Sequence, residues 1–577
     1  MINSKKNKTR PLFDPWGHLG ERRRALLEKG WPAFFRGVVL PRLPVGALEG
    51  EFSREMGRPT KELESLIGAL VLQQVFDLTD DETANSYAFR VDWHYALDMA
   101  GEGDGEKYVS ERTLRGYRER LVETGLAETL FEGVTDALLK GFGVETGHQR
   151  LDSTLIRSNM RRLTRVELCR RVLGRLLRQL QREAPEAWGR IPEEIRERYG
   201  EGERGCFGLK PSQARQALLG CGEALWTVLT LLSGEDGVQE WECFRQAKQV
   251  LGDQFTVRGT EGRAEIEVKG KGEMTTDSLQ NPTDGEARYD GHKGAGYYGQ
   301  VLETYSPKAG DPEQVDGPAQ PNLVTHVAVT PANVVDETAV GPALEETQRR
   351  GISPETLVAD GAYGSDEVVE GVQAQGVTLV APARGPKPRK GLEGFEMNDT
   401  TGEMLRCPQG ETPIQVILHQ KRPVAIFSHV SCNGCPRKES CPAVRRKRGR
   451  FVRYTAKEIR LARRRQAMET EAFQEKYRWR AGIEGTISQY KNQMGGGRIR
   501  YRGLAKVTFA VKLKFLGLNV FRSVAAWLEM IKKRGGECPF FKLLKEFFGL
   551  LFRWMQKCLF TSLEPVFPLD FLPGHQL

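Results

Sequence analysis

The stretch YRWRAGIEGTISQYK, which runs from Tyr477 to Lys491, places one carboxylate among cations and aromatic rings. In a helix that turns about 100° per residue, Tyr477, Arg480, Glu484 and Lys491 fall on one stripe roughly 60° wide, beside an apolar stripe. Arg480 and Glu484 have the i,i+4 spacing of an ordinary ion pair, in the less favourable order. That pair leaves Tyr477 and Lys491 unexplained, so the stripe indicates more than surface pairing.

Two aspartates stand where strands of an α/β sheet bring polar groups to a site. Asp360 ends TLVAD and is followed by the glycine turn GAYG, and ligands collect at the carboxyl ends of such strands. Asp152 lies within the β-like RLDSTLI, where a charge is unfavourable unless the strand face lines a site. Taken singly, each aspartate is equally explained as a turn former or a helix cap.

Together with Glu484, these two aspartates form a set of three carboxylates. Three carboxylates can hold two Mg²⁺ or Mn²⁺ ions, because hard cations prefer oxygen ligands. Such a pair of ions activates a water or hydroxyl nucleophile and stabilises the leaving oxygen of a phosphodiester. Neighbouring arginine and lysine side chains then hold the phosphate backbone. These residue types therefore point to metal-dependent phosphodiester chemistry.

The motifs resemble those of one family. YRWRAGIEGTISQYK matches, at every spaced position, the Y-x2-R-x3-E-x6-K signature of DDE transposases from bacterial insertion sequences. LDSTLIRSN resembles the first-aspartate strand of that family and LVADGAYGSDE its second-aspartate segment. YDGHKGAGYYGQVLETY, VAVTPANVVDET and RIRYRGLAKVTFAVKLKFLGLNVFR resemble further family segments in the expected order. SREMGRPTKELESLIGALVLQQVFDLTDDE with SERTLRGYRERL resembles its N-terminal helical domain.

The resemblance spans roughly residues 50 to 525 and is weakest over 160–275. It implies an RNase H-like catalytic domain, a mixed sheet with flanking helices, in which Asp152, Asp360 and Glu484 are catalytic and hold Mg²⁺ or Mn²⁺. It also implies that Tyr477, Arg480 and Lys491 contact DNA. The gap of more than a hundred residues between Asp360 and Glu484 departs from compact family members.

Four cysteines suggest a second metal site. Cys407, and then Cys432, Cys435 and Cys441 in SCNGCPRKESCP, suit a tetrahedral zinc site of four thiolates. The spacing differs from that of a standard two-knuckle ribbon, and His429 can replace one ligand. The alternative is a set of unrelated free thiols.

Further cations are candidates for contacts with DNA. Arg112, Arg115, Arg118 and Arg120 lie in a helical pattern that fits a DNA-binding module or a plain helical bundle. His292 and Lys293, in GHKGAG, lie on or beside a strand of the expected sheet, where a structural histidine is the alternative. The basic run RRKRGRFVRYTAKEIRLARRRQ directly precedes the glutamate helix, so we expect it to follow DNA phosphates. An isolated run of this kind is often only solvated surface.

Composition sets the broad class of the protein. The chain has 577 residues, 39% of them hydrophobic and 28% charged, with a net charge of +9, which predicts a globular protein of several domains. The N-terminus has no apolar signal region, and no run reaches the roughly 18 apolar residues of a spanning helix. We therefore expect no membrane association and a cytoplasmic, nucleoid-associated location in bacteria, where cysteines are thiols or metal ligands.

The predicted fold class is α/β, with an all-α N-terminal domain before the RNase H-like domain. The expected segments are an N-terminal arm (1–50), a helical DNA-binding domain (51–145), the catalytic domain (146–530) with a mostly helical insertion (160–275) and a cysteine-rich insertion (385–445), and an amphipathic tail (531–577).

These features predict a DNA transposase. It binds the terminal inverted repeats of its own element, cleaves at the element ends and joins the 3′-hydroxyl ends to target DNA, as a homodimer on paired ends. Two alternatives remain open, which are an RNase H-like nuclease without strand transfer and an inactive copy that only binds DNA.

Overall fold

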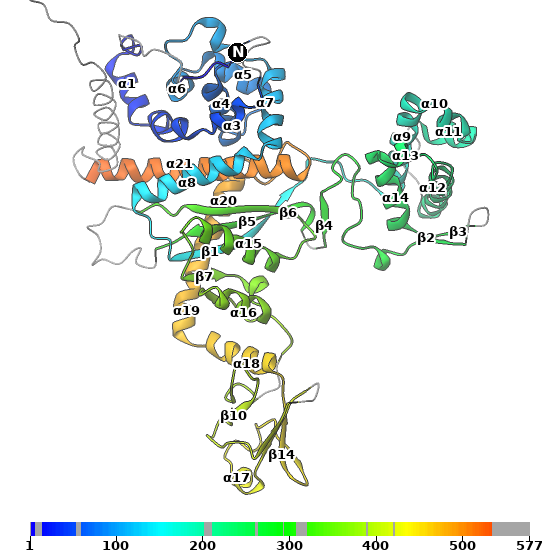
Figure 1. The fold of residues 1–577 in the computed structure, drawn as a ribbon, viewed down its shortest axis with the longest axis vertical. Coiled ribbons are helices and arrows are strands. Elements are labelled where there is room, and N and C mark those ends of the chain that lie inside the picture. Colours follow the sequence, from blue (N-terminus) through cyan, green and yellow to red (C-terminus); the bar gives the residue numbers. More distant parts are fainter. Residues whose placement is uncertain are drawn as a thin grey trace, which may run out of the picture.

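The computed structural model describes residues 2–5, 14–52, 59–200, 210–259, 264–291, 293–306, 320–387, 391–418 and 422–533. His292 and nearly all of the predicted amphipathic tail, from residue 534 onward, lie outside these ranges. Helices and a mixed sheet together make an α/β protein (Figure 1). Within the described ranges, no helix combines the length and apolar character that crossing a bilayer requires.

The N-terminal part is helical throughout. Its helices are α1 (Glu21–Glu28), α2 (Trp31–Phe34), α3 (Val45–Glu49), α4 (Leu63–Val75), α5 (Asp80–Phe89), α6 (Val91–Ala96), α7 (Glu111–Glu123) and α8 (Leu126–Phe142). The arm predicted over residues 1–50 is not a separate segment, because Phe34 and Leu48 are buried in the same core as Leu66 of α4. Its apolar residues fold into the helical bundle instead of leaving it.

A six-stranded sheet forms the centre of the molecule. The strands are β1 (His148–Arg157), β4 (Arg288–Asp290), β5 (Gly294–Thr304), β6 (Val324–Pro331), β7 (Thr356–Ala359) and β8 (Thr378–Val380). The order is β4-β5-β1-β7-β8, with β6 also pairing with β5. Strands β1, β5 and β6 pair antiparallel, whereas β1, β7 and β8 pair parallel. The parallel part contains the positions of both predicted aspartates.

One long helix joins the N-terminal bundle to the sheet. Helix α21 (Leu504–Lys533) lies between the bundle and the sheet in Figure 1 and contacts α4, α8 and β6. Close approach to α4 needs a glycine, since a Cβ at Gly517 would lie 2.5 Å from Val75 Cγ2. Buried residues of the bundle, the sheet and α21 form one continuous hydrophobic core. The domain boundary predicted near residue 145 therefore separates helices from strands along the chain, but the two parts share one hydrophobic core.

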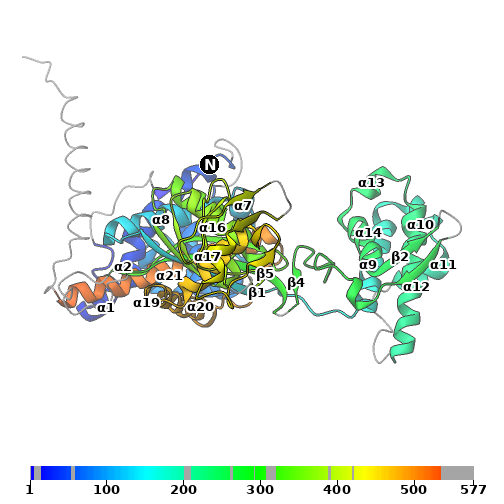
Figure 2. The same ribbon diagram turned by 90° about the horizontal axis from the view of Figure 1, so that it is seen from below.

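The residues between β1 and β4 form a unit with its own core. It contains α9 (Arg165–Glu183), α10 (Pro185–Arg190), α11 (Glu193–Gly200), α12 (Pro211–Leu231), α13 (Asp236–Gln239), α14 (Glu242–Gln254), β2 (Phe255–Arg258) and β3 (Glu265–Val268). Leu173, Leu225 and Val250 are buried at its centre. Figures 1 and 2 both show this unit set apart from the sheet.

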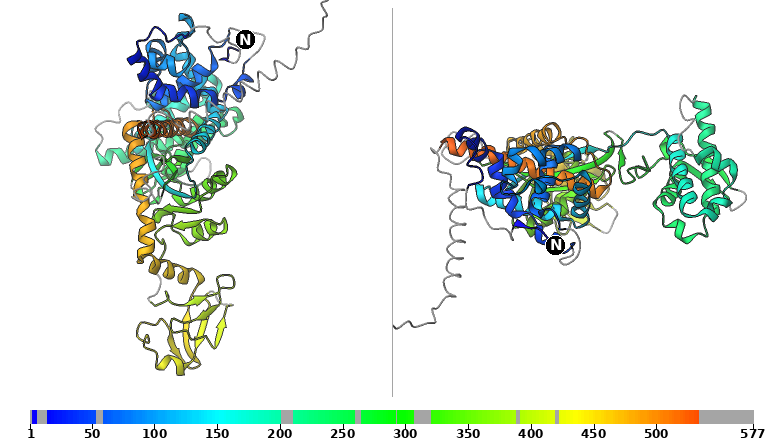
Figure 3. Two further views of the ribbon diagram at one scale, coloured as in Figure 1. Left: turned by 90° about the vertical axis from the view of Figure 1, so that its left-hand side faces the viewer. Right: turned by 90° about the horizontal axis from the view of Figure 1, so that it is seen from above.

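The cysteine-containing segment is a small β-rich unit at the opposite end of the molecule from the N-terminal bundle (Figures 1 and 3). Its elements are β9 (Glu396–Met397), β10 (Met404–Arg406), β11 (Gln415–Ile417), β12 (Val424–Phe427), α17 (His429–Asn433), β13 (Val444–Arg446) and β14 (Gly449–Arg453). Phe395, Phe427 and Val452 form its core together with residues of α18 (Ala456–Met468). Helix α18 thus connects this unit to the rest of the protein.

Candidate active site

The sheet register brings the two predicted aspartates to one level. In the parallel pair of β1 and β7, Leu151 is opposite Ala359, so the next residues, Asp152 and Asp360, are neighbours at the carboxyl end of β7. Side chains alternate along a strand. Because Leu151 and Ala359 are buried together in the core on one face, Asp152 turns to the opposite face.

Backbone amides hold both carboxylates in place. Asp152 Oδ1 accepts a hydrogen bond from the Ser153 amide at 2.8 Å. Asp360 caps the short 3₁₀ helix η8 (Gly361–Tyr363), with Oδ1 accepting from the Ala362 amide at 2.8 Å. Each aspartate thus satisfies a local amide with one oxygen, as a capping residue would, and keeps its second oxygen for other partners.

The third carboxylate comes from a helix that is not continuous. The single helix expected over Tyr477–Lys491 is divided into α19 (Glu471–Tyr477), a 3₁₀ turn η9 (Arg478–Arg480) and α20 (Ala481–Gln493). Glu484 lies in the first turn of α20. The predicted apolar stripe is confirmed by the burial of Ile483, Tyr490 and Met494. Across the 3₁₀ turn, Arg480 still pairs with Glu484.

Arg480 connects the helix to the sheet. Its Nη1 donates to Glu484 Oε1 at 2.7 Å, and its Nη2 lies 3.4 Å from Asp152 Oδ2. The i,i+4 pair seen in the sequence therefore forms, but the same guanidinium also reaches an aspartate that lies 328 residues earlier. Arg480 bridges two of the three predicted carboxylates.

Electrostatics show that the three carboxylates share one space. Burial, together with the charges of Asp360 and Glu484, raises the pKa of Asp152 to about 6, although the Ser153 amide and Arg480 oppose this rise. Burial likewise raises the pKa of Tyr477, which is affected by the same carboxylates. Excess negative charge in a partly buried site is the condition under which a cation binds favourably.

Cations line the neighbouring surface. Burial lowers the pKa of Lys491, and the charges of Lys293 and Arg157 lower it further. The Lys293 ammonium lies 4.8 Å from the centroid of the Tyr298 ring. The structure thus brings together Lys293 and Lys491, which are 198 residues apart in the sequence, beside the carboxylates.

A buried network that the sequence did not reveal positions α20. Glu303 of β5 is fully buried and accepts from Arg150 Nε at 2.7 Å, from Thr486 Oγ1 at 2.5 Å, and from Arg522 Nη1. Arg150 Nη1 also donates to the Trp479 carbonyl at 3.0 Å. The available signal was Arg150, a second charged residue two positions before Asp152 in the same strand.

Arg118 does not have the role predicted for it. It is buried, with Nη1 2.6 Å from Asp80 Oδ1 and its guanidinium 4.8 Å from the centroid of the Tyr501 ring. It therefore has no free face for a phosphate and instead joins α7 to α5. Arg112 and Arg115 are exposed on the same helix.

The four predicted zinc ligands line one small cavity. Cys407, Cys432, Cys435 and Cys441 surround a space of about 50 Å³ in the β-rich unit. Burial raises the pKa of the Cys432 and Cys441 thiols, and the neighbouring thiols raise it further. His429 makes a different contact, with Nε2 2.9 Å from the Arg446 carbonyl.

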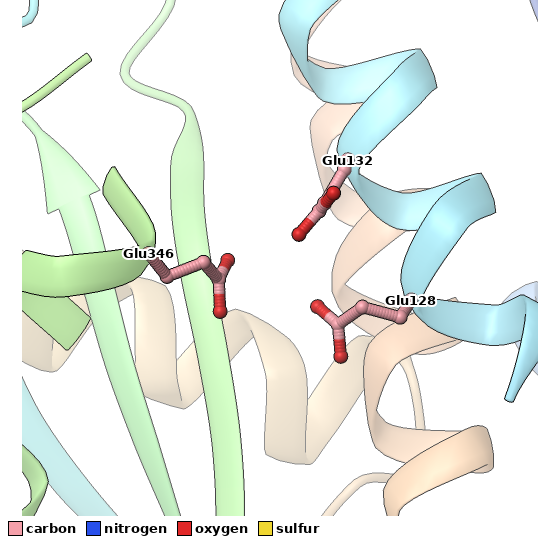
Figure 4. Close-up of side chains that lie close together, drawn as sticks. All are labelled: Glu128, Glu132 and Glu346. Atoms are coloured by element: carbon pink, nitrogen blue, oxygen red, sulfur yellow. The ribbon is translucent and has the colours of Figure 1, made fainter. Parts of the chain in front are cut away.

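A different acidic cluster meets a geometric criterion for metal binding. The cluster consists of Glu128, Glu132 and Glu346 (Figure 4). Their carboxylate oxygens lie within 4.8 Å of one another, and no other group of three possible ligands in the described ranges is as compact. The predicted carboxylates and thiols do not meet this distance in the present conformation. Glu128 and Glu132 belong to α8, and Glu346 belongs to α15 (Val340–Arg349).

Each carboxylate of this cluster already has a cation as partner. Glu128 pairs with Lys512, Glu132 pairs with Arg349, and Glu346 lies 3.2 Å from Arg350 and 2.7 Å from His326. The charge is thus compensated by side chains that link α8 to α15 and α21. We interpret the cluster as an ion-pair network between the bundle and the sheet.

Comparison with known proteins supports a function in DNA transposition. Residues 406–524 match the family described as a transposase DDE domain. The matched part includes Arg480 and Glu484, whereas Asp152 and Asp360 precede it. No curated protein matches the chain. The domain match supports a DDE transposase, an enzyme class that implies DNA as substrate and the use of divalent metal.

Proposed function

We propose that this protein is an insertion-sequence transposase that cleaves DNA at the ends of its element and joins the freed 3′-hydroxyls to target DNA. The observation that carries the proposal is the meeting of Asp152, Asp360 and Glu484 across a parallel strand pair and a helix, with Arg480 bridging two of them. The domain match over 406–524 supports the same chemistry. The antiparallel strands β1, β4, β5 and β6, followed along the chain by the parallel strands β7 and β8, support an RNase H-like fold.

The carboxylates suit Mg²⁺ or Mn²⁺, because all donors are hard oxygens. Bound ions would supply Lewis acidity and an activated nucleophile at the phosphodiester. Asp152, Asp360 and Glu484 would hold the ions. Arg480 pairs with Asp152 and Glu484, so its guanidinium lies beside the carboxylates, where it would hold a phosphate. Asp152 and Asp360 remain oriented by the Ser153 and Ala362 amides throughout.

The DNA backbone is proposed to lie along Tyr477, Arg480, Lys491 and Lys293. Tyr477, Arg480 and Lys491 interact electrostatically with the carboxylates, and the charge of Lys293 acts on Lys491. A phosphate between two cations relieves their repulsion, which favours binding of the strand at this position. We extend the role to His292, Arg112 and Arg115 on sequence grounds, and we propose a homodimer on paired terminal inverted repeats.

The test uses the purified protein, Mg²⁺ and DNA that carries the terminal inverted repeats of the element. Cleavage at the ends and joining to a target plasmid is the expected result. Glu484→Gln should reduce both by more than the roughly 10- to 100-fold that follows loss of an outer partner of a metal ligand. Cutting without joining would favour a nuclease. Binding without cutting, unchanged by Glu484→Gln, would refute an enzymatic role.

We also propose a structural Zn²⁺ held by Cys407, Cys432, Cys435 and Cys441. Support comes from the shared cavity and from the raised pKa of Cys432, because burial and the neighbouring cysteines disfavour a thiolate there that a cation would stabilise. Thiolates favour Zn²⁺, unlike the oxygen donors of the first site. Metal analysis should find one equivalent of zinc fewer in a Cys432→Ser, Cys435→Ser variant than in the wild type or in Cys243→Ser, which changes a thiol of the helical unit. Equal zinc contents would refute the site.

A further inference from the structure

The longest basic run of the chain is divided by the fold into two parts with different surroundings. Its first part forms the hairpin of β13 and β14, and its second part forms α18. In the sequence, the two parts form one continuous basic run. The side-chain contacts distinguish them.

The cations of α18 are used inside the protein. Arg460 pairs with Asp366 at 2.6 Å and with Glu370 at 3.0 Å, both on α16 (Asp366–Ala374). Arg464 Nη2 donates to the Gly364 carbonyl at 3.0 Å, and Lys457 pairs with Glu367. These contacts fasten α18, and with it the β-rich unit, to the loop and helix that follow Asp360.

The cations of the hairpin have no such partners. Arg445, Arg446, Lys447 and Arg448 are exposed. In the part of the chain that the structure describes, no carboxylate forms an ion pair with any of these four side chains. Residues 437–453 contain eight cations and one acidic residue, Glu439, in a chain whose net charge is +9. This segment alone therefore has a net charge of +7.

The hairpin turn places the cations close together. Arg446 pairs with Gly449, so Lys447 and Arg448 form a two-residue turn. The turn itself is unstrained at these two residues, because neither has a positive φ. Four successive cations repel one another at this tip, and an external anion would relieve the repulsion.

We propose that the β13–β14 hairpin binds the phosphate backbone of duplex DNA as a second contact, at a fixed separation from the catalytic carboxylates. This inference rests on the proposed function for the identity of the polyanion. The hairpin lies at the end of the molecule opposite the N-terminal bundle (Figures 1 and 3). Because α18 fastens the unit to α16, DNA held by the hairpin is placed relative to Asp360.

The test measures duplex binding by fluorescence anisotropy at several salt concentrations, without added Mg²⁺. The variant replaces Arg445, Arg446, Lys447 and Arg448 with Gln. The logarithm of the binding constant falls linearly with the logarithm of the salt concentration, and each lost phosphate contact should make this line less steep by about 0.9. If the variant and the wild type bind equally at 1 M salt, one lost contact weakens binding by the variant at 0.1 M salt about eightfold. We expect the loss of at least two contacts, which is about 60-fold.

A matched control removes the same charge elsewhere, by replacing Arg22, Arg23, Arg182 and Arg258 with Gln. This variant should keep the wild-type slope, and restoring the hairpin charge with Lys should recover most of the affinity. An unchanged slope in the hairpin variant would overturn the proposal. So would an equal loss in the control, or a hairpin-dependent preference for single-stranded RNA over duplex DNA. Glu484→Gln should bind normally here, so failure of catalysis and failure of this contact are separable.

Discussion

Glu303 provides the most direct test of how the fold positions the candidate catalytic helix. Its carboxylate is fully buried and gathers Arg150 of β1, Thr486 of α20 and Arg522 of α21. Glu303→Gln preserves the shape of the side chain but removes the charge. Two guanidinium groups then remain without a counter-ion, one on Arg150, whose side chain is 6% exposed, and one on Arg522, whose side chain is 19% exposed.

The expected cost follows from the burial. Removing one partner of a buried ion pair destabilises a protein by about 3–5 kcal/mol, because the remaining charge is left uncompensated. Water reaches part of Arg522, so we expect the lower end, about 3 kcal/mol. A change of that size corresponds to an increase on the order of 100-fold in the opening of the helix.

Hydrogen exchange followed by mass spectrometry measures this opening locally. Peptides covering 478–493 should exchange on the order of 100-fold faster in Glu303→Gln, whereas peptides of the separately packed α12 should not change. Glu267→Gln is the matched control, since its ion pair with Arg258 is about half exposed and should be worth at most about 1 kcal/mol. Equal, small effects of both substitutions would refute the proposed anchoring of α20.

Three further perturbations test other parts of the structure. Gly482→Ala should destabilise the protein in urea unfolding, because the new Cβ would lie 1.8 Å from a guanidinium nitrogen of Arg150. Gly485 has open space around it, so Gly485→Ala should leave the free energy of unfolding unchanged or raise it by about 0.5–1 kcal/mol. The reverse order of stability would contradict this packing. Arg118→Ala should cost at most about 3 kcal/mol, because the partly buried Asp80 loses its counter-ion and keeps only the hydrogen bond from Gln73. Replacing an exposed arginine of the same helix should change stability by less than about 0.5 kcal/mol. Equal midpoints of unfolding would argue against a structural Arg118. Burial raises the pKa of Glu62 from 4.5 to about 7. The protonated Glu62 therefore contributes stability below about pH 4.5, and this contribution is lost as the pH rises through 7. The free energy of unfolding should be lower at pH 8 than at pH 5 in the wild type, and this difference should be smaller in Glu62→Gln.

Local patterns in the sequence were sufficient for the elements that carry the site. The strand-like TLVA before Asp360, the glycine turn after it and the apolar stripe of α20 depend on residues that are close in the chain, and each lies where it was expected. The helical character of 160–275 and of the N-terminal part follows from the same short-range periodicity. These features are local because backbone hydrogen bonding and side-chain spacing are local.

Local sequence patterns did not show which elements share a hydrophobic core. Hydrophobic periodicity indicates that a helix has a buried face but does not specify what covers it. The residues predicted as an N-terminal arm belong to the bundle, and the bundle shares its core with the sheet through α21. Packing across more than 400 residues decided these boundaries, which is why they could not be drawn from composition.

The sequence by itself determined which groups can do chemistry, because carboxylates, thiols and guanidinium groups have their properties wherever they stand. Only the tertiary structure decided how each is used. In the folded protein, Arg480 contacts two carboxylates instead of one, and Arg118 is buried against Asp80. Arg460 of α18 forms an internal ion pair, whereas the arginines at the tip of the β13–β14 hairpin are exposed. The physical reason is that a charge acts through its surroundings, and residues far apart in the chain supply those surroundings.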